Sequence, residues 1–293
     1  MNVQSTNSAQ NPLDLSPPGL AARGIEIIRP LETSEPLRHA LFDFDGTLSL
    51  VREGWIDIMV PMMVDELANT GTDESVSELT EVARTFVAEL TGKQTIYQMI
   101  RLAEEIANRG GSPQEPVLYK HRYHDLLMQR IAARRQGLSD GTIPAKDLLV
   151  PGSRELLEAL RDRGIALYLA SGTDEVFVKE EAELLGLTEF FGQHIYGAVD
   201  DYKTFSKAQV IQRILKTTQA DPRQLVGFGD GYVEIQNVKQ VGGIAVGVAS
   251  DEANRSGKCD PWKRDRLIGV GADLIVPDFS QHEALIGYLL QHR

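Results

Sequence analysis

The stretch Leu41-Phe-Asp-Phe-Asp-Gly-Thr47 decides the fold of this 293-residue chain. Residues 39–44 form a short, mostly apolar run of the kind found in buried strands, and it ends in two carboxylates, Asp43 and Asp45. Because Gly46 lets the strand end in a turn, both carboxylates are expected to point toward one place. Crowded carboxylates repel each other unless a cation or a shared proton compensates them, and Mg²⁺ suits such oxygen-rich sites. The competing interpretation is a strand that merely ends in an acidic turn. The choice between the two interpretations depends on the other motifs.

A second buried strand is predicted at residues 165–170, and it runs into Ser171, Gly172 and Thr173. The small residues expose backbone N–H groups and the serine adds a hydroxyl, which together form an anion cradle at the start of the next helix. The same tripeptide is common in ordinary turns, so its meaning depends on the neighbouring motifs.

Two charged segments follow further along the chain. The residues after Ser206 have helical spacing, which makes this serine the N-cap and puts Lys207 in the first turn, where a cation needs an anionic partner. The predicted strand 225–229 ends in Asp230, and Glu234 follows four residues later on the same helical face. Such segments at the carboxyl ends of parallel strands meet at one edge of the sheet.

In this order, Asp-x-Asp-Gly-Thr, a strand ending in Ser-Gly-Thr, a helix-opening lysine and Gly-Asp-Gly-x-x-Glu resemble the haloacid dehalogenase superfamily of phosphoryl-transfer enzymes. The motifs span residues 41–237. The resemblance implies an α/β fold with a doubly wound, mainly parallel, Rossmann-like sheet and an inserted helical cap. The predicted strands lie near residues 39–44, 165–170, 194–197, 225–229, 243–248 and 273–276, with a short edge strand within 24–30.

The resemblance also implies the catalytic roles. Asp43 would be the nucleophile that becomes an aspartyl-phosphate, and Asp45 would be the general acid for the leaving alcohol and then the base for water. Lys207 would neutralise charge on Asp43 and the phosphate; Lys203 is the alternative for this lysine. Because displacement of a halide needs no protonated leaving group, the second acid favours phosphate esters over dehalogenation.

The same resemblance implies a Mg²⁺ site and a phosphate site. Mg²⁺ would be held by Asp43, the backbone carbonyl of Asp45, Asp230 and Glu234, the last directly or through water, since the superfamily often has an aspartate there. The phosphoryl oxygens would be held by the residues that follow the two strands: Gly46, Thr47, Ser171, Gly172 and Thr173.

Residues 52–149 carry helical periodicity and almost no strand signal, with helices predicted near 54–69, 75–91, 94–109 and 113–136. The resemblance implies that they form a mobile cap hinged near residues 50–53 and 149–152. The catalytic core would then comprise residues 23–51 and 150–293. Residues 1–22 are polar and proline-containing, and we predict a disordered tail rather than a signal peptide.

Substrate choice is expected to lie in the cap. Lys93 and Gln94 begin a helix that could face the site, and Gln98 follows on the same face. Residues 119–124, which combine cations and aromatics, form a second candidate. For both segments the favoured interpretation is ordinary solvated helix surface.

Composition excludes several classes of protein. A net charge of −12 without a dense Lys/Arg tract argues against nucleic-acid binding, and no apolar run is long enough to span a membrane. Cys259 is the single cysteine, so no internal disulfide forms and a reducing, cytoplasmic location is expected. We expect a monomer or homodimer whose partner is a small phosphate ester.

The resulting hypothesis is a Mg²⁺-dependent phosphatase that hydrolyses a small phosphorylated metabolite, with sugar phosphates among the candidates. A phosphomutase that uses the same aspartyl-phosphate is the alternative. A non-catalytic module that binds phosphometabolites is a hypothesis of another class, but it would not need Asp43. Phosphonate cleavage would require a Schiff-base lysine in the cap, for which Lys93 and Lys120 are the candidates.

Overall fold

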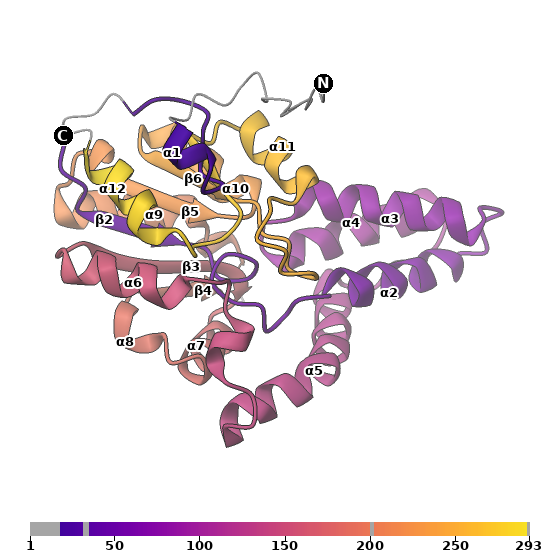
Figure 1. Cartoon of the computed structure of the whole chain (residues 1–293). Coiled ribbons are helices and arrows are strands. Elements are labelled where there is room, and N and C mark those ends of the chain that lie inside the picture. The colour runs from indigo at the N-terminus through magenta and orange to yellow at the C-terminus, as the bar shows by residue number, and fades with distance from the viewer. Residues whose placement is uncertain (1–17, 32–34, 200–201, 292–293) are drawn as a thin grey trace, which may run out of the picture.

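The computed structural model describes residues 18–31, 35–199 and 202–291 (Figure 1). They fold around a sheet with the spatial order β1-β7-β6-β5-β2-β3-β4, in which all neighbours pair in parallel except β1 with β7. The strands are β1 (Glu26–Ile27), β2 (His39–Phe42), β3 (Ala166–Asp174), β4 (Ile195–Ala198), β5 (Leu225–Gly229), β6 (Ile244–Val248) and β7 (Leu274–Val276). The predicted doubly wound, mainly parallel sheet is confirmed, including the short edge strand β1.

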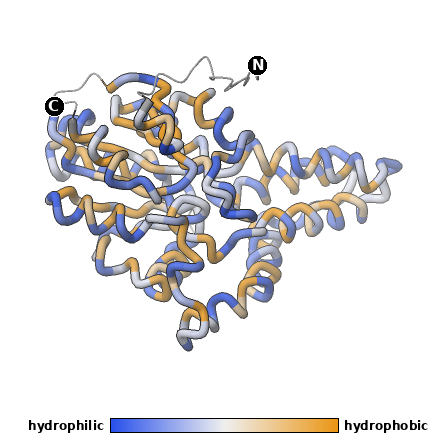
Figure 2. Tube along the Cα trace, in the orientation of Figure 1, coloured by the Kyte–Doolittle hydropathy of each residue, from blue (hydrophilic) through white to orange (hydrophobic). Residues whose placement is uncertain are grey.

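Helices cover both faces of the sheet, which is why its central strands are mostly apolar. Phe42 belongs to the apolar cluster that includes Leu156 of α6, whereas its neighbour Leu41 belongs to the one that includes Ile211 of α9 and Ile235 of α10. The helices of the core are α6 (Ser153–Asp162), α7 (Glu175–Leu184), α8 (Thr188–Phe191), α9 (Lys207–Thr218), α10 (Tyr232–Val241), α11 (Pro261–Gly269) and α12 (His282–Gln291). In Figure 2 the hydrophobic residues are concentrated in the strands and on parts of these helices.

Four helices between β2 and β3 project beyond the sheet as a separate bundle (Figure 1). They are α2 (Ile56–Ala68), α3 (Val76–Leu90), α4 (Thr95–Asn108) and α5 (Pro116–Asp140), close to the predicted helices except that α5 begins later and runs longer. Met59, Met63, Leu79 and Phe86 are buried in the bundle, at the spacing of one helical face. We call this bundle the cap; the limits predicted for it, residues 52–149, stay a prediction.

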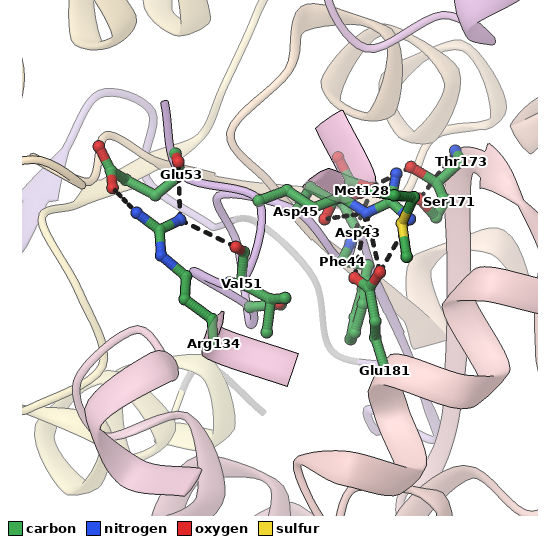
Figure 3. A network of polar contacts seen from close by, with 12 residues as sticks. Asp43, Phe44, Asp45, Val51, Glu53, Met128, Arg134, Ser171, Thr173 and Glu181 are labelled. Carbon is green, nitrogen blue, oxygen red and sulfur yellow. Dashed lines mark hydrogen bonds and ion pairs between the residues drawn. The ribbon is translucent and has the colours of Figure 1, made fainter. Parts of the chain in front are cut away.

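The two connections between core and cap run side by side. Leu50 N–H donates to the carbonyl of Leu148 (2.9 Å), and Val150 N–H donates to that of Leu48 (2.9 Å). Arg134 of α5 reaches back to the carbonyls of Val51 and Glu53, as Figure 3 shows. The first connection is therefore tied to the longest cap helix.

The structure of the first described residues differs in part from the disordered tail predicted for residues 1–22. Most of residues 1–22 lie outside the described residues, but Pro18–Ala21 form helix α1, so the prediction of disorder is wrong there. The physical reason is an anchor: Leu20 packs against the core, and its carbonyl accepts from Ile25 N–H at 3.1 Å. Among the described residues, no helix combines the length and apolarity needed to cross a membrane.

Candidate active site

The carboxyl ends of β2, β3 and β5 open into one cavity of about 100 Å³, between the sheet and the cap. The core contributes residues from all four motifs to its lining: Asp43, Asp45, Ser171, Gly172, Thr173, Lys207 and Asp230. Parallel pairing of β2 with both β3 and β5 brings these distant segments together. Asp43, Asp45 and Asp230 therefore face one space, whereas Glu234 is not part of its lining.

Asp43 and Lys207 form a buried ion pair. The lysine Nζ lies 2.8 Å from Asp43 Oδ1, and the two side chains are 4% and 7% exposed. Burial raises the pKa of Asp43, and the Lys207 charge opposes that rise. Ser206 caps α9 by accepting from Gln209 N–H, as predicted, and this fixes the lysine at the first helical position. Lys207, not the alternative Lys203, is the lysine at the site.

Lys207 has a second anionic partner in Glu234 of α10. Glu234 is 3% exposed, and apart from this ion pair its oxygens have no hydrogen-bond partner among the described residues. Its carboxylate therefore faces the lysine. The helix dipole alone would disfavour a lysine at this position, and two carboxylates more than compensate for that effect.

Asp45 is held in a different environment. Thr173 Oγ1 donates to its Oδ2 at 2.9 Å, Ser171 Oγ lies 3.5 Å away, and Arg52 Nε lies 3.9 Å from Oδ1. Burial raises the pKa of Asp45 to about 7, although Arg52 opposes the rise. A carboxyl group with this pKa can carry a proton near neutral pH, which is what a general acid requires.

The second motif differs in secondary structure from the prediction. Ser171, Gly172 and Thr173 continue strand β3, and α7 begins only at Glu175. The tripeptide is therefore a strand end rather than a helix start. Pairing with β4 extends this far, since Asp174 is in register with Ala198 after a bulge. Ser171 and Thr173 face Asp45, and the backbone N–H of Thr173 donates to Ser171 Oγ at 3.1 Å.

Thr47 does not line the cavity and is fully buried. Its Oγ1 accepts from the backbone N–H of Asp230 at 2.9 Å, so it joins the first motif to the fourth. The prediction that Thr47 holds the phosphate is wrong for its side chain, because that side chain is occupied in aligning Asp230. Gly46 also lies against this aspartate: a Cβ there would come 2.3 Å from Asp230 Oδ2.

Gly46→Ala is expected to displace Asp230. Gly46 has a φ of 75°, and so has Gly141 with 76°, but nothing lies within 4 Å of a Cβ at Gly141. Both alanine variants should lose about 1–2 kcal/mol of stability from the left-handed backbone. Only Gly46→Ala should also lose activity, by about 10²-fold, because the site is misplaced. Thermal unfolding and kcat/KM measure the two effects; equal activity loss in both variants would contradict the role of Gly46.

The acids fit a divalent cation. Asp43 Oδ2 and Asp230 Oδ1 have no hydrogen-bond or ion-pair partner among the described residues, and both side chains line the cavity. The Asp230 charge raises the pKa of Asp43, so the two carboxylates repel each other. No group of three or more metal-ligating side chains occurs in the described part of the chain, but Mg²⁺ is often bound by one or two carboxylates with water and phosphate. Asp43, Asp230 and the carbonyl of Asp45 would hold it; ligation by Glu234 stays a prediction.

Two charged clusters at the site were not predicted. Lys263 of α11 lies 2.8 Å from Asp230 Oδ2 and also pairs with Glu252, so one oxygen of Asp230 is fixed by a lysine. Arg52 pairs with the fully buried Glu181 of α7, with Nη2 2.8 Å from Oε1. Neither lysine nor arginine lies in a motif, and no spacing in the sequence links them to their partners.

The cap meets the core through the turn before α4. A Cβ at Gly172 would lie 2.7 Å from the carbonyl oxygen of Lys93, so the two backbones touch. Gln94 Nε2 donates to the carbonyls of Tyr202 (2.9 Å) and Phe205 (2.8 Å). The amide nitrogen of Gln94 thus joins cap to core, because core carbonyls lie within reach, while its Oε1 has no hydrogen-bond partner among the described residues. Substrate binding by Gln94 stays a prediction. Lys93 does line the cavity, with its backbone against the second motif.

The second cap candidate is only partly solvated surface, since residues 121 and 122 are exposed. Tyr119 and Tyr123 are buried, Lys120 pairs with Asp174, and His124 stacks on Phe177 with ring centres 4.0 Å apart. The interpretation as solvated helix was wrong for these four residues because α5 packs against α7 of the core. Tyr123 reaches the cavity itself.

The fold and the cavity at its carboxyl edge define a hydrolase of the haloacid dehalogenase type. The sequence model of the haloacid dehalogenase-like hydrolases matches residues 37–242, and the chain belongs to this family. The family resemblance expected from the motifs is thereby confirmed.

Individual relatives are more distant. A phosphoserine phosphatase of Archaeoglobus fulgidus is 25% identical over 272 residues, which cover 87% of this chain and 65% of the relative. Thus the chain spans less than two thirds of that protein's length. A β-phosphoglucomutase structure from Clostridium difficile superposes with a TM-score of 0.56 at 15% identity, covering 87% of this chain and 98% of its own. A family IA HAD hydrolase of Entamoeba histolytica gives 0.56 at 20% identity, covering 87% and 99%. These structures share the fold.

Proposed function

We propose that the protein is a Mg²⁺-dependent phosphatase that hydrolyses a small phosphorylated metabolite through an aspartyl-phosphate on Asp43. The observation that carries the proposal is the contrast between two neighbouring acids. Asp43 is paired with Lys207 and keeps one oxygen free toward the cavity, whereas burial raises the pKa of Asp45 to about 7. One acid is thus suited to attack and the other to donate a proton.

The proposed reaction assigns one step to each residue of the site. Asp43 attacks phosphorus through one carboxylate oxygen, the bond to the leaving oxygen breaks, and Asp45 gives that oxygen its proton. Asp45, now ionised, takes a proton from the water that attacks the aspartyl-phosphate, and inorganic phosphate leaves. Lys207 and the backbone N–H groups near Gly172 compensate the charge on the equatorial oxygens. Mg²⁺, when bound, supplies further positive charge there.

The alternatives use the same groups differently. A phosphomutase would share the first half of the reaction but return the phosphoryl group to the product. A non-catalytic binding module would gain nothing from a buried acid aimed at the ligand, since such a charge repels phosphate. The similarity to a phosphoserine phosphatase supports the phosphatase, and the cavity of about 100 Å³ favours a small substrate.

A phosphate-release screen tests the proposal. The purified protein with Mg²⁺ is given sugar phosphates, nucleotides, short organic phosphates and phenyl phosphate, and free phosphate is measured alongside isomeric esters. Release of inorganic phosphate supports the phosphatase. An isomerised ester without release would identify a mutase, and no turnover on the whole panel would reject both enzymes.

The pH dependence should follow Asp45. Because the acid must be protonated, kcat/KM is expected to fall about tenfold per pH unit above a pH of about 7. The Thr173 hydroxyl donates to the ionised carboxylate and so lowers its pKa. Thr173→Val should therefore raise that pKa and shift the decrease in kcat/KM to higher pH. Thr85→Val, on the exposed side of α3, is the control that should leave the pH dependence of kcat/KM unchanged. If kcat/KM of Thr173→Val falls over the same pH range as that of the unmodified protein, Asp45 is excluded as the acid.

A further inference from the structure

Three buried side chains line the cavity that no step of the proposed reaction uses. Arg52 comes from the first connection, Gln98 from α4 and Tyr123 from α5, and they are 7%, 4% and 6% exposed. They line the cap side of the cavity, where Arg52 Nε lies 3.9 Å from Oδ1 of Asp45, the acid that would protonate the leaving group. The leaving group of a phosphate ester would occupy this side once its phosphoryl group faces Asp43.

Each of the three keeps an unused hydrogen-bonding group. Arg52 binds Glu181 through Nε and Nη2, which leaves Nη1 without a partner in the described part of the chain. The amide of Gln98 and the hydroxyl of Tyr123 also lack a partner among the described residues, and neither is sealed off from the cavity. Buried polar groups are normally satisfied, so groups left open toward a cavity are groups available to a ligand.

The cations on this side carry little net charge. Arg52 is neutralised by Glu181, which Arg135 also approaches at 3.5 Å while pairing with Glu180. Lys93, the other cap cation of the lining, is exposed, and its ammonium lies 6.0 Å from the ring centre of Tyr97, which is not part of this lining. A second anionic group on the substrate would meet Asp45 and the already neutralised Arg52. Lys93 has no carboxylate partner among the described residues, but it is exposed and its ammonium lies near Tyr97, so burial of such a charge is costly.

The rest of the cap-side lining includes apolar side chains as well as the hydroxyl groups of Thr91 and Thr95. Trp55 and Met59 line the same side of the cavity. A ligand that fits must therefore offer C–H surface to them and neutral oxygens to Arg52, Gln98 and Tyr123. A polyhydroxylated carbon chain has both.

We infer that Arg52, Gln98 and Tyr123 form a subsite for a neutral, hydroxyl-bearing leaving group, so the substrate is a polyol or sugar phosphate and not a phosphorylated carboxylic or amino acid. This inference rests on the proposed function. Gln98 and Tyr123 bind the hydroxyl groups, and Arg52 donates from Nη1. A substrate that leaves these groups unpaired is discriminated against, because their desolvation is not compensated.

A matched pair of substrates tests the inference. Glycerol 3-phosphate and 3-phosphoglycerate have the same carbon skeleton and the same primary ester, and they differ by one carboxylate. With the intact protein and Mg²⁺, we expect kcat/KM to be at least about tenfold higher for glycerol 3-phosphate. A preference for 3-phosphoglycerate, or for phosphoserine over both, would overturn the inference while leaving the phosphatase in place.

Variants test the subsite itself. Gln98→Leu keeps the volume of the side chain but removes its amide, and we expect the ratio of kcat/KM for glycerol 3-phosphate over phenyl phosphate to fall at least about tenfold. Tyr123→Phe should act in the same direction, and it serves as a second variant if Gln98→Leu folds poorly. Gln129→Leu, on the exposed face of α5, is the matched control and should not change the ratio. Equal losses on both substrates in the two subsite variants would refute the subsite.

A failure of the proposed function has a different signature. If not even phenyl phosphate is hydrolysed, calorimetry on the intact protein compares the binding of the same two ligands. Tighter binding of glycerol 3-phosphate then supports the subsite without the phosphatase. Equal or weaker binding of this ligand rejects the subsite as well.

Discussion

Asp43→Asn is expected to abolish turnover, with kcat/KM reduced at least about 10⁴-fold, because an amide oxygen cannot displace the leaving group to form the acyl phosphate. The variant keeps the shape of the side chain. Its fold should persist, since Lys207 retains Glu234 as a partner and the substitution removes a carboxylate whose burial is unfavourable. Steady-state kinetics with the best ester of the screen measure the loss.

Binding should behave in the opposite way to turnover. Replacing a carboxylate by an amide removes a charge that repels phosphate, so calorimetry should show ligand affinity that is unchanged or higher. Rapid quenching and mass spectrometry of the unmodified protein should find one phosphoryl group, on Asp43. Asp65→Asn, on the exposed side of α2, is the matched control with full activity. Residual turnover of Asp43→Asn within about tenfold of the unmodified protein would exclude nucleophilic catalysis by this residue.

Lys207→Met is the second variant with a large expected effect. The ammonium group compensates Asp43 and Glu234 in a nearly closed environment, and it lies where the transferred phosphoryl group gathers charge. We expect kcat to fall about 10³-fold, as for loss of one strong donor to a transition state. Two buried carboxylates also lose their cation, so the free energy of unfolding should decrease by about 3–5 kcal/mol.

Comparison with Lys203→Met tests which of the two candidate lysines is the lysine of the third motif. The Lys203 ammonium lies over the ring of Tyr202, 5.8 Å from its centre, and not in the lining of the cavity. Its replacement should change kcat by less than about tenfold. Chemical denaturation and kinetics are measured on both variants. If Lys203→Met were the more damaging of the two, the assignment of the third motif would have to be exchanged.

The closed arrangement of cap and core explains why substrate selection and chemistry share one cavity. The turn at Lys93 touches Gly172, Gln94 binds the loop before Lys207, and Lys120 pairs with Asp174. Each contact joins a cap residue to a segment that carries a motif. A lid with such contacts can exclude water while it positions the leaving group.

Much of this was readable from local pattern. The strands that precede Asp43, Ser171 and Asp230 are short apolar runs, and such runs in a parallel sheet are buried on both faces whatever the neighbouring sequence. Ser206 as the N-cap of α9 followed from local chemistry in the same way. The contacts of Thr47 and Gln94 could not be foreseen, because their own segments contain no information about what they face. Thr47 has a structural role because it binds the backbone of Asp230, and Gln94 has one because it binds the carbonyls of Tyr202 and Phe205. Both contacts are visible only in the tertiary structure.

The amino-acid sequence by itself determined the sheet, the family and the acids at its edge, because strand periodicity and motif order are properties of contiguous residues. Tertiary structure decided which lysine pairs with Asp43, that Lys263 holds Asp230, and that Glu181 neutralises Arg52. It also decided that Gln98 and Tyr123 turn toward the cavity. These are pairings between residues far apart in the chain, and a helix carries no mark of the face that a distant element will cover.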